Sequence, residues 1–393
     1  MFDKATIKYF AKVGSGQGAP QRETDFSNDG FPFIRAGSLE NLLNGMDECE
    51  LPKVNEDIAR EYKLKLYQPN TIVFAKSGMS ALKGRIYKLK NPCYVVNHLA
   101  TIELSDKAVA DYVLYALRYF SPVRLINDNS YPSLKQSVIE NYEIPFPKDK
   151  ENQLHIASIL SKAENLIAQR KESIRLLDEF LKSTFLEMFG DPVRNEKGWE
   201  KDKVITVTDC IVPGRDKPKS FTGNTPWFTT EDLNHKGFVT KSKKSLGLSD
   251  DEIKEVRARV IPAGSVLMTC VGDLGVLSVC KEDCVVNQQL HAFICKQEIN
   301  NLFLMYSLSF QTKFMYKKAT ATTVPYMNKT TCNSIPVIKP PIELQTQFAH
   351  IVEKTEALKN QYQQSLQELE NLYGSLSQKA FRGELSINKA VSV

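Results

Sequence analysis

Four residues in the second half of the chain have side chains that commonly bind zinc: Cys280, Cys284, His291 and Cys295. Thiolates and imidazoles are the usual ligands of tetrahedral zinc sites. The spacing lacks the C-x2-C knuckle of the common zinc motifs. We therefore expect no metal site in this protein.

The segment NPCY (residues 91–94) differs at one position from the Asn-Pro-Pro-Tyr-like loop of amino-methyltransferases that modify DNA bases. Such an enzyme also needs an S-adenosylmethionine pocket, usually a strand that enters a glycine-rich turn and then a helix. The glycine-rich segment Gly14 to Gly18 is followed by Ala-Pro and an irregular polar stretch. We therefore expect a turn at NPCY and no bound cofactor, with a self-contained DNA adenine methyltransferase as the alternative from another functional class.

Composition is that of a globular protein with two or three domains. The chain has 393 residues, of which 42% are apolar, and a formal net charge of +5. It contains no apolar run long enough to span a membrane, and its beginning does not resemble a signal peptide. Eight scattered cysteines then predict reduced thiols, and we expect a cytoplasmic protein with no membrane partner.

Two halves of the sequence resemble each other at a nearly constant offset, which predicts a tandem repeat. The matching pairs are PFIRAGSL (from 32) with PWFTTEDL (from 226), TIVFAKSG (from 71) with SVLMTCVG (from 265), VVN (from 95 and 285), and YPSLK (from 131) with VPYMN (from 324). Each half has a Gly/Pro-rich opening, several short β-branched runs, and one segment of helical period (107–120 and 299–310). These patterns predict an α+β fold with two similar mixed α/β globules. The second half has KEDC in the slot of NPCY, which argues against a catalytic loop.

Each globule is followed by a long helical segment with apolar residues at heptad positions, which is typical of a coiled coil. The expected seam residues are Leu160, Ile167, Ile174 and Leu181 in the first helix, and Leu344, Ile351, Leu358, Leu369, Leu372 and Leu376 in the second. We expect an intramolecular antiparallel coiled coil with pseudo-twofold symmetry; packing of each helix on its own globule, or a homodimer seam, are the alternatives. The expected boundaries are 1–150 for the first globule, 151–190 for the central helix, 191–341 for the second globule and 342–393 for the last helix and tail.

Over essentially its whole length the chain resembles the specificity subunits of type I restriction–modification systems. The resemblance is carried by the repeat, the exits IPFP and IPVIKPPIELQTQFAHIV, the junction FLEMFGDPVRNEKGW and the ending SLSQKAFRGEL. It implies a non-catalytic subunit whose globules are target-recognition domains, each binding one half of a bipartite, asymmetric target in double-stranded DNA. It further implies that the helices set the spacer and dock two modification (methyltransferase) subunits, which restriction (endonuclease) subunits join. A Type IIB or phage-exclusion methylation system and a scaffold that binds proteins only are alternatives.

DNA recognition needs polar loop side chains for bases and cations for phosphates. In the first globule the candidates are Arg35, Lys76, Ser77, Lys83, Arg85, Asn97, His98, Asn127, Asn129, Tyr131 and Lys135. In the second they are Arg215, Lys217, Lys219, Thr229, Thr230, Asp273, Gln288, Gln289, Thr322, Thr323 and Tyr326. Asn97 and Asn287 are expected at one equivalent position, so that residues differing between the copies, such as His98 against Gln288, are the better candidates for base recognition.

Overall fold

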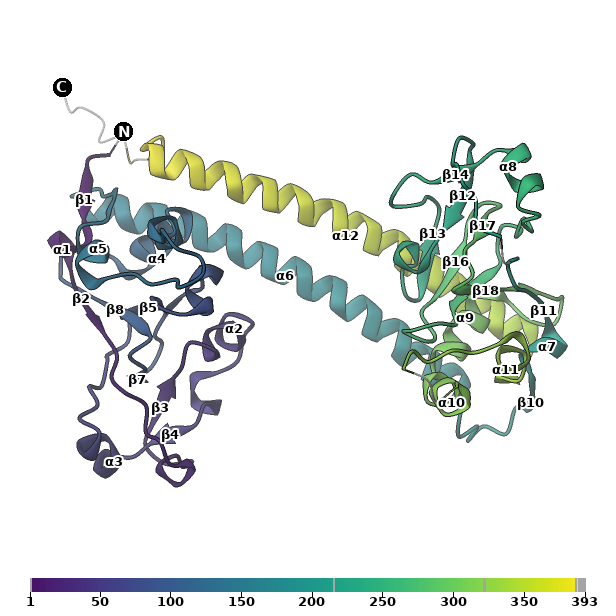
Figure 1. The fold of residues 1–393 in the computed structure, drawn as a ribbon, viewed down its shortest axis with the longest axis horizontal. Helices are drawn as coiled ribbons and strands as arrows, with labels where there is room; N and C mark the ends of the chain where they lie inside the picture. The colour runs from purple at the N-terminus through teal and green to yellow at the C-terminus, as the bar shows by residue number, and fades with distance from the viewer. Residues whose placement is uncertain (1, 215, 321–322, 386, 388–393) are drawn as a thin grey trace. The chain divides into compact units, whose positions relative to one another are not determined.

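Short runs of β-branched and aromatic residues form the strands of two units that share one arrangement (Figure 1). The computed structural model describes residues 2–214, 216–320, 323–385 and 387. Unit 1 comprises Met1–Gln169 with Leu366–Val393, and unit 2 comprises Arg170–Ser365. No helix in these described ranges is both long and apolar enough to cross a membrane.

Unit 1 contains three sheets with the strand orders β2-β8-β5-β6, β4-β3-β7 and β1-β9, and only β3 and β7 run parallel among these neighbours. Its strands are β1 (Lys4–Thr6), β2 (Ala11–Ser15), β3 (Phe31–Ile34), β4 (Lys53–Val54), β5 (Ile72–Ala75), β6 (Ile86–Lys88), β7 (Tyr94–Val95), β8 (Leu99–Leu104) and β9 (Glu143–Pro145). Its short helices are α1 (Ile7–Phe10), α2 (Ser38–Leu43), α3 (Glu56–Glu61), α4 (Ala110–Tyr119) and α5 (Gln136–Glu140).

Unit 2 repeats these sheets as β11-β18-β15-β16, β14-β12-β17 and β10-β19, with β13 added parallel to β16. Its strands are β10 (Glu200–Lys203), β11 (Thr208–Ile211), β12 (Thr225–Phe228), β13 (Gly237–Val239), β14 (Gly247–Leu248), β15 (Val266–Thr269), β16 (Leu277–Cys280), β17 (Val285–Val286), β18 (Leu290–Cys295) and β19 (Pro336–Lys339). Its short helices are α7 (Val204–Val207), α8 (Asp250–Glu255), α9 (Asn301–Ser309), α10 (Thr312–Lys318) and α11 (Lys329–Asn333). The predicted repeat and the mixed α/β character of each half are confirmed.

The central strand β5 shows why each larger sheet is buried on both faces. Successive side chains of a strand point to opposite faces. Ile72 and Phe74 therefore join a core with α4 and the long helices, whereas Val73 and Ala75 join a second core with the small sheet. All four residues are buried, so this strand is uniformly apolar rather than alternating.

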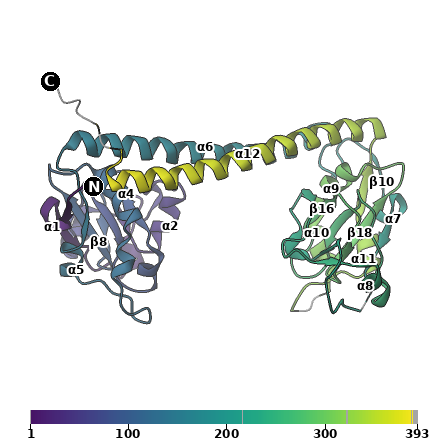
Figure 2. The same cartoon turned by 90° about the horizontal axis from the view of Figure 1, so that it is seen from above.

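Two long helices, α6 (Lys150–Phe189) and α12 (Ile342–Arg382), lie side by side in Figures 1 and 2. In unit 1 the first part of α6 shares a core with the last part of α12, where Leu160 and Phe381 are both buried. In unit 2 the order is reversed, and Phe185 near the end of α6 contacts Phe348 near the start of α12, with ring centroids 5.3 Å apart. The helices therefore pair antiparallel within one chain, as predicted.

A buried glutamine fixes the start of each long helix to the globule that precedes it. The Gln153 side chain accepts a bond from the Val109 N–H at 2.8 Å and donates to the Pro147 carbonyl at 2.7 Å. Gln345 makes the same two contacts, with the Asn300 N–H at 2.8 Å and the Pro340 carbonyl at 2.8 Å. Because a buried amide without partners is costly, these bonds fix the direction in which each helix leaves its unit.

The predicted seam of α12 is wrong at two positions, since Leu358 is 36% exposed and Leu372 is 49% exposed. The face of α12 that meets α6 instead carries polar residues that a count of leucines passes over. In unit 2, Lys359 forms an ion pair with Asp178 at 2.6 Å. Six other predicted seam residues are half-buried. Four are in α12, namely Leu344, Ile351, Leu369 and Leu376, and two are in α6, namely Ile167 and Ile174. Leu160 and Leu181 are fully buried.

Candidate nucleic-acid interface

Four loops of unit 1 meet at the ends of β2, β5 and β7, and we call this meeting point the loop junction of unit 1 (residues 16–17, 76–78, 97–98 and 131–134). The Lys76 N–H donates to the His98 carbonyl at 2.9 Å, and the Asn97 N–H donates to the Gln17 carbonyl at 2.8 Å. The Leu134 N–H returns to the Lys76 carbonyl at 2.8 Å. These main-chain bonds hold the loops in place whatever their exposed side chains are.

Unit 2 has an equivalent loop junction (residues 214, 216–218, 270–272, 287–289 and 324–327). The Cys270 N–H donates to the Gln289 carbonyl at 2.9 Å, and the Met327 N–H donates to the Cys270 carbonyl at 2.9 Å. The opening loop is held by the Gln288 side chain, whose amide donates to the Gly214 carbonyl at 3.2 Å. The same loops therefore meet in both units.

These bonds correct the expected equivalence of the two polar turns. The Val96 N–H donates to Ile34 in unit 1, whereas the Asn287 N–H donates to the matching Phe228 in unit 2. Asn287 therefore corresponds to Val96, and the expectation that it matches Asn97 is wrong. By the same register Asn97 matches Gln288, and His98 matches Gln289. The repeated Val-Val-Asn letters are misleading because the second copy is shifted by one residue against its strand partner.

Exposed and hydrogen-bonding side chains cover the loop junction of unit 1. The Ser77 hydroxyl lies 2.8 Å from the His98 Nδ1 atom. Tyr131 is 84% exposed and Met79, which the sequence analysis missed, is 65% exposed. Asn97 is exposed and Lys76 is half-buried. A polar surface with isolated large apolar side chains suits contact with base edges and methyl groups.

The loop from 127 to 130 brings the two predicted asparagines, Asn127 and Asn129, to the surface. Its shape is set by Asp128, whose carboxylate accepts the Ser130 N–H at 2.8 Å. Lys135, just beyond Tyr131, is also exposed. This loop could therefore present amide and cationic groups together.

The other predicted cations of unit 1 differ in their freedom. Lys83 is exposed, whereas Arg85 is half-buried and forms an ion pair with Glu40. The Arg35 guanidinium lies 4.8 Å from the centre of the Phe26 ring. Lys83 is therefore the better candidate for a phosphate contact, because Arg85 already has a carboxylate partner.

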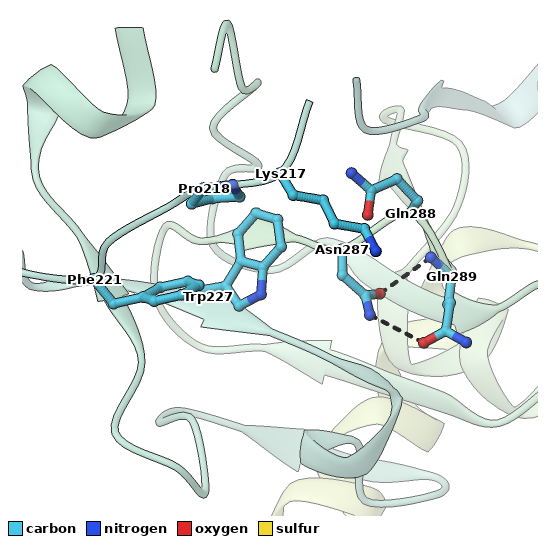
Figure 3. A pocket seen from close by; sticks show the side chains of 7 residues that line it. All are labelled: Lys217, Pro218, Phe221, Trp227, Asn287, Gln288 and Gln289. Carbon is cyan, nitrogen blue, oxygen red and sulfur yellow. Dashed lines mark hydrogen bonds between the residues drawn. The ribbon is translucent and has the colours of Figure 1, made fainter. Parts of the chain in front are cut away.

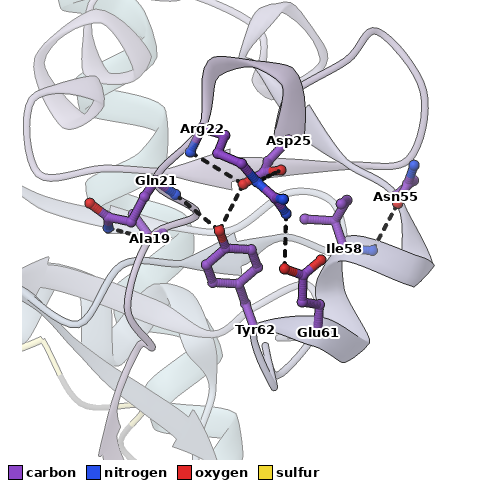
Figure 4. Close-up of polar contacts among 8 residues, drawn as sticks. All are labelled: Ala19, Gln21, Arg22, Asp25, Asn55, Ile58, Glu61 and Tyr62. Atoms are coloured by element: carbon purple, nitrogen blue, oxygen red, sulfur yellow. Dashed lines mark hydrogen bonds and ion pairs between the residues drawn. The ribbon is translucent and has the colours of Figure 1, made fainter.

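A network of side chains fastens the opening loop of unit 1 to α3, as Figure 4 shows. Arg22 forms ion pairs with Asp25 at 2.9 Å and with Glu61 at 2.8 Å. The Tyr62 hydroxyl donates to Asp25 at 2.8 Å. The pKa of Asp25 is lowered because these hydrogen bonds and the Arg22 charge outweigh the opposing effect of burial. This network connects the opening loop to the end of α3.

In unit 2 the loop junction adjoins a pocket of about 560 Å³ (Figure 3). One wall is aromatic, where the Phe221 ring meets the Trp227 ring edge-on at 5.9 Å between centroids. The opposite wall is formed by amide side chains, and the pocket is lined by Lys217, Pro218, Phe221, Trp227, Asn287, Gln288 and Gln289. The apolar members were not among the predicted residues, although Pro218 lies between the cations Lys217 and Lys219 and Phe221 follows closely.

Two hydrogen bonds tie the amide wall together. The Asn287 side-chain amide donates to the Gln289 Oε1 atom at 3.1 Å, and the Gln289 N–H donates back to the Asn287 Oδ1 atom at 3.1 Å. Gln289 is exposed, and Asn287 is half-buried. The Gln289 side chain is thus held in a fixed orientation at the surface.

The aromatic wall is anchored by Glu252, whose carboxylate accepts the Thr222 N–H at 3.1 Å and the Ser249 N–H at 2.8 Å. Hydrogen bonds lower the pKa of Glu252 to about 2, with the Ser220 side chain contributing most and the Ser249 backbone next. The carboxylate is therefore ionised at neutral pH, when it fixes the loop that carries Phe221.

The remaining predicted residues of unit 2 have mixed surroundings. Thr229 caps a short helical turn, and both its N–H and its hydroxyl donate to Asp232, at 2.7 and 2.9 Å. Thr230 begins this turn and is half-buried. The other described residues are exposed: Lys217, Lys219, Asp273, Thr323 and Tyr326. Of these, Lys219 forms an ion pair with Glu255, and the Asp273 carboxylate accepts a hydrogen bond from the Tyr316 hydroxyl. Arg215 and Thr322 lie outside the described residues.

The NPCY segment is a structural turn, as expected. The carboxylate of the fully buried Glu48 accepts the Lys90 N–H at 2.8 Å, the Asn91 N–H at 2.7 Å and the Asn91 side-chain amide at 2.9 Å. Cys93 is completely buried. The side-chain amide of Asn91, which a catalytic loop would use to contact a DNA base, is therefore already hydrogen-bonded to Glu48.

The glycine-rich opening of unit 1 has a packing role. A Cβ atom on Gly16 would lie 2.0 Å from the Val95 carbonyl oxygen, so only glycine allows this close approach. Within the described residues no group of three or more His, Cys, Asp or Glu side chains is arranged to hold a metal ion. Burial raises the pKa of the Cys270 thiol to about 12, which keeps this thiol protonated at neutral pH.

Comparison with known proteins connects this arrangement to one family. The family described as the type I restriction modification DNA specificity domain matches the chain twice, over residues 2–176 and 204–371. The type I restriction enzyme MjaIX specificity subunit of Methanocaldococcus jannaschii is 34% identical over 164 residues, which are 41% of this chain and 37% of that protein. The MjaVIII specificity subunit of the same organism is 22% identical over 343 residues, or 81% of this chain and 77% of that protein.

Solved structures share the fold. The S subunit of a type I restriction–modification system from M. genitalium superposes with a TM-score of 0.61 at 15% identity, covering 97% of this chain and 96% of that one. A chain from a structure on complex assembly and conformational transition of the type I R-M system has a TM-score of 0.52 at 18% identity, covering 98% of both chains. With two matches to the specificity domain, two equivalent units and a shared antiparallel helix pair, the chain belongs to the type I restriction–modification DNA specificity family.

Proposed function

We propose that this chain is the DNA-recognition subunit of a type I restriction–modification complex, and that companion subunits perform the chemistry. The observation that carries this proposal is the pair of equivalent loop junctions, in which three of the loops share the same main-chain bonds but carry different exposed side chains. A shared backbone framework that carries different polar side chains suits two related domains that recognise different DNA sequences.

In this proposal each unit binds one half of a bipartite, asymmetric target in double-stranded DNA. The loop junctions and the surrounding cations, such as Lys83 in unit 1 and Lys217 in unit 2, supply base and phosphate contacts. Because the side chains of the junctions differ, the half-sites should differ as well. Because contacts with phosphates supply much of the binding free energy, the affinity for DNA should fall steeply as the salt concentration rises.

The long helices are proposed to dock two modification subunits, which restriction subunits then join. Support comes from large apolar side chains on the surface of α6, whose exposed fractions are 56% for Leu154, 49% for Leu166, 49% for Leu176 and 50% for Phe180. Apolar residues repeated along one exposed helix are typical of a protein interface. Leu358 and Leu372 of α12 are also exposed.

The helix pair is further proposed to set the spacer between the half-sites. A helix of 40 residues such as α6 is about 60 Å long at about 1.5 Å per residue, which exceeds one turn of B-DNA at about 34 Å. Inserting one heptad in each helix, beside the contact of Arg170 with the Tyr362 ring, adds about 10 Å. The preferred spacer should then lengthen by about three base pairs.

The test is a genome-wide methylation map of a methylation-deficient host that expresses this chain with the modification subunit of its own system. We expect one bipartite motif that vanishes when this chain is omitted. Methylation that persists without the chain, or DNA methylation by the purified chain alone, would contradict the proposal. The heptad insertion tests the spacer separately, because an unchanged motif would remove the helices from that role.

A further inference from the structure

One position of the loop junction carries different chemistry in the two units although its backbone is held identically. The carbonyls of His98 and Gln289 each accept a bond of 2.9 Å, from Lys76 and Cys270 respectively. Both side chains are exposed, and each is held by one neighbouring polar side chain, Ser77 for His98 and Asn287 for Gln289. A side chain that is both exposed and held in place is preorganised to bind.

We propose that residues 98 and 289 are base-recognising residues, and that Gln289 recognises adenine in the half-site of unit 2. This inference rests on the proposed function and deepens it. It assigns Ser77 and Asn287 as positioning residues that orient the two recognising side chains. It also names the residue pair that makes the two half-sites different.

Gln289 suits adenine because of the bond that it already makes. Its Oε1 atom accepts from Asn287, which fixes the oxygen and nitrogen ends of the amide. The oxygen retains a second lone pair, and the Nε2 group retains donors. One acceptor beside one donor matches the N6 donor and N7 acceptor of adenine in the major groove.

His98 offers a smaller recognition surface. Ser77 occupies the Nδ1 atom, which leaves Nε2 as the ring atom available to a base. A single atom forms one hydrogen bond, and the N7 acceptor is shared by adenine and guanine. Discrimination through His98 should therefore be weaker than discrimination through Gln289, so the two half-sites should differ in stringency at these positions.

The position of Gln289 is also suited to DNA by its surroundings. It lines the pocket beside Lys217, an exposed cation that could neutralise a phosphate while the amide contacts a base. The aromatic wall of Trp227 and Phe221 lies across the same pocket (Figure 3). Base contact and phosphate contact are thus available at one site.

The experiment is a methylation map of cells that express the full chain with its modification subunit, comparing the wild type with Gln289→Ala and Gln289→Glu. Loss of a bidentate contact should relax discrimination at one base of the unit 2 half-site by about 5- to 150-fold in Gln289→Ala. A carboxylate accepts from the amino group of cytosine but cannot donate. Gln289→Glu should therefore change the preferred base at that position from adenine to cytosine.

Matched variants separate recognition from folding. Gln363→Glu makes the same substitution at an exposed position of α12 and should leave the motif unchanged. His98→Ala should relax only the unit 1 half-site. Asn287→Asp retains the acceptor for the Gln289 N–H but cannot donate to Oε1. It should therefore weaken the same base preference as Gln289→Ala, and Asn287→Ala should do so too.

The outcomes distinguish this inference from the proposed function. An unchanged unit 2 half-site in both Gln289 variants would overturn the inference while leaving the function intact. If Gln289→Glu abolishes methylation altogether, the motif of Gln289→Ala decides: a relaxed base supports the inference and an intact base overturns it. Absence of any site-specific methylation in the wild type would contradict the proposed function itself.

Discussion

The carboxylate of Glu48 accepts two hydrogen bonds from Asn91, one from the Asn91 backbone N–H at 2.7 Å and one from the Asn91 side-chain amide at 2.9 Å. Glu48 is fully buried, so these bonds replace its contacts with water. The most enzyme-like segment of the sequence is therefore part of the packing of unit 1.

Asn91→Ala should lower the free energy of unfolding of unit 1 by about 1.5–3 kcal/mol, because one bond to a buried carboxylate is lost. The methylation motif of the complex should stay the same. Urea unfolding of the purified chain and a methylation map measure the two effects. Asn360→Ala, on the exposed face of α12, serves as the control with no expected loss of stability. A folded variant that no longer supports methylation would restore the catalytic interpretation of NPCY.

Lys83→Ala and Arg85→Ala should affect DNA binding differently. Lys83 is exposed, and its loss should reduce the slope of log affinity against log salt by about 0.9. Arg85→Ala should change that slope less, since Glu40 already neutralises the guanidinium. Binding of the assembled complex to its target, titrated at several salt concentrations, tests this order. Equal slopes for both variants would show that the ion pair opens on binding.

Leu176→Glu and Phe180→Glu should weaken assembly with the modification subunit without unfolding the chain. These side chains are 49% and 50% exposed, and burial of either against a partner is worth about 1.5–3 kcal/mol. The affinity for the modification subunit should therefore fall by about 10- to 150-fold, measured by calorimetry. Ala168→Glu, an exposed position of the same helix that points away from the face of Leu176 and Phe180, is the charge-matched control. Unaltered affinity in both variants would place the docking surface elsewhere.

Phe348→Ala should destabilise unit 2 far more than Leu358→Ala. Phe348 is fully buried against Phe185, Phe189 and Tyr306, so its truncation should cost about 3–5 kcal/mol. Leu358 is exposed despite its heptad position and should cost about 0.5 kcal/mol or less. Thermal and urea unfolding measure both. Similar losses for the two variants would support the seam that the leucine spacing predicts.

The buried imidazole of His291 should make unit 2 sensitive to acid. Burial lowers the pKa of His291 from 6.5 to about 4, so the folded state favours the neutral ring. Its contribution is present above about pH 6.5 and is lost as the pH falls toward 4, because the unfolded chain then takes up the proton first. The loss amounts to about 3 kcal/mol. His291→Leu should flatten the pH dependence of unfolding over this range, and an unchanged profile would exclude His291 as its source.

The sequence alone determined the elements whose signals are local. Heptads without interruption predict α6, and glycine at 190, with a φ of +74°, ends it where the sequence predicts a stop. The tandem repeat was visible in the sequence because the strands of both units bury similar runs of apolar residues. Burial in a core restricts such positions to similar residue types.

The tertiary structure alone decided which loop residues are equivalent and which apolar residues are buried. The repeated letters Val-Val-Asn align Asn97 with Asn287. The main-chain bonds to neighbouring strands instead make His98 of unit 1 equivalent to Gln289 of unit 2. Such bonds join residues that are far apart in sequence, so the sequence does not reveal them. Leu358 fits the heptad yet is exposed, because the neighbouring Lys359 reaches Asp178. Local periodicity fixes which residues share a face of a helix or strand, whereas only the packed partner decides which face is covered and which is left for binding.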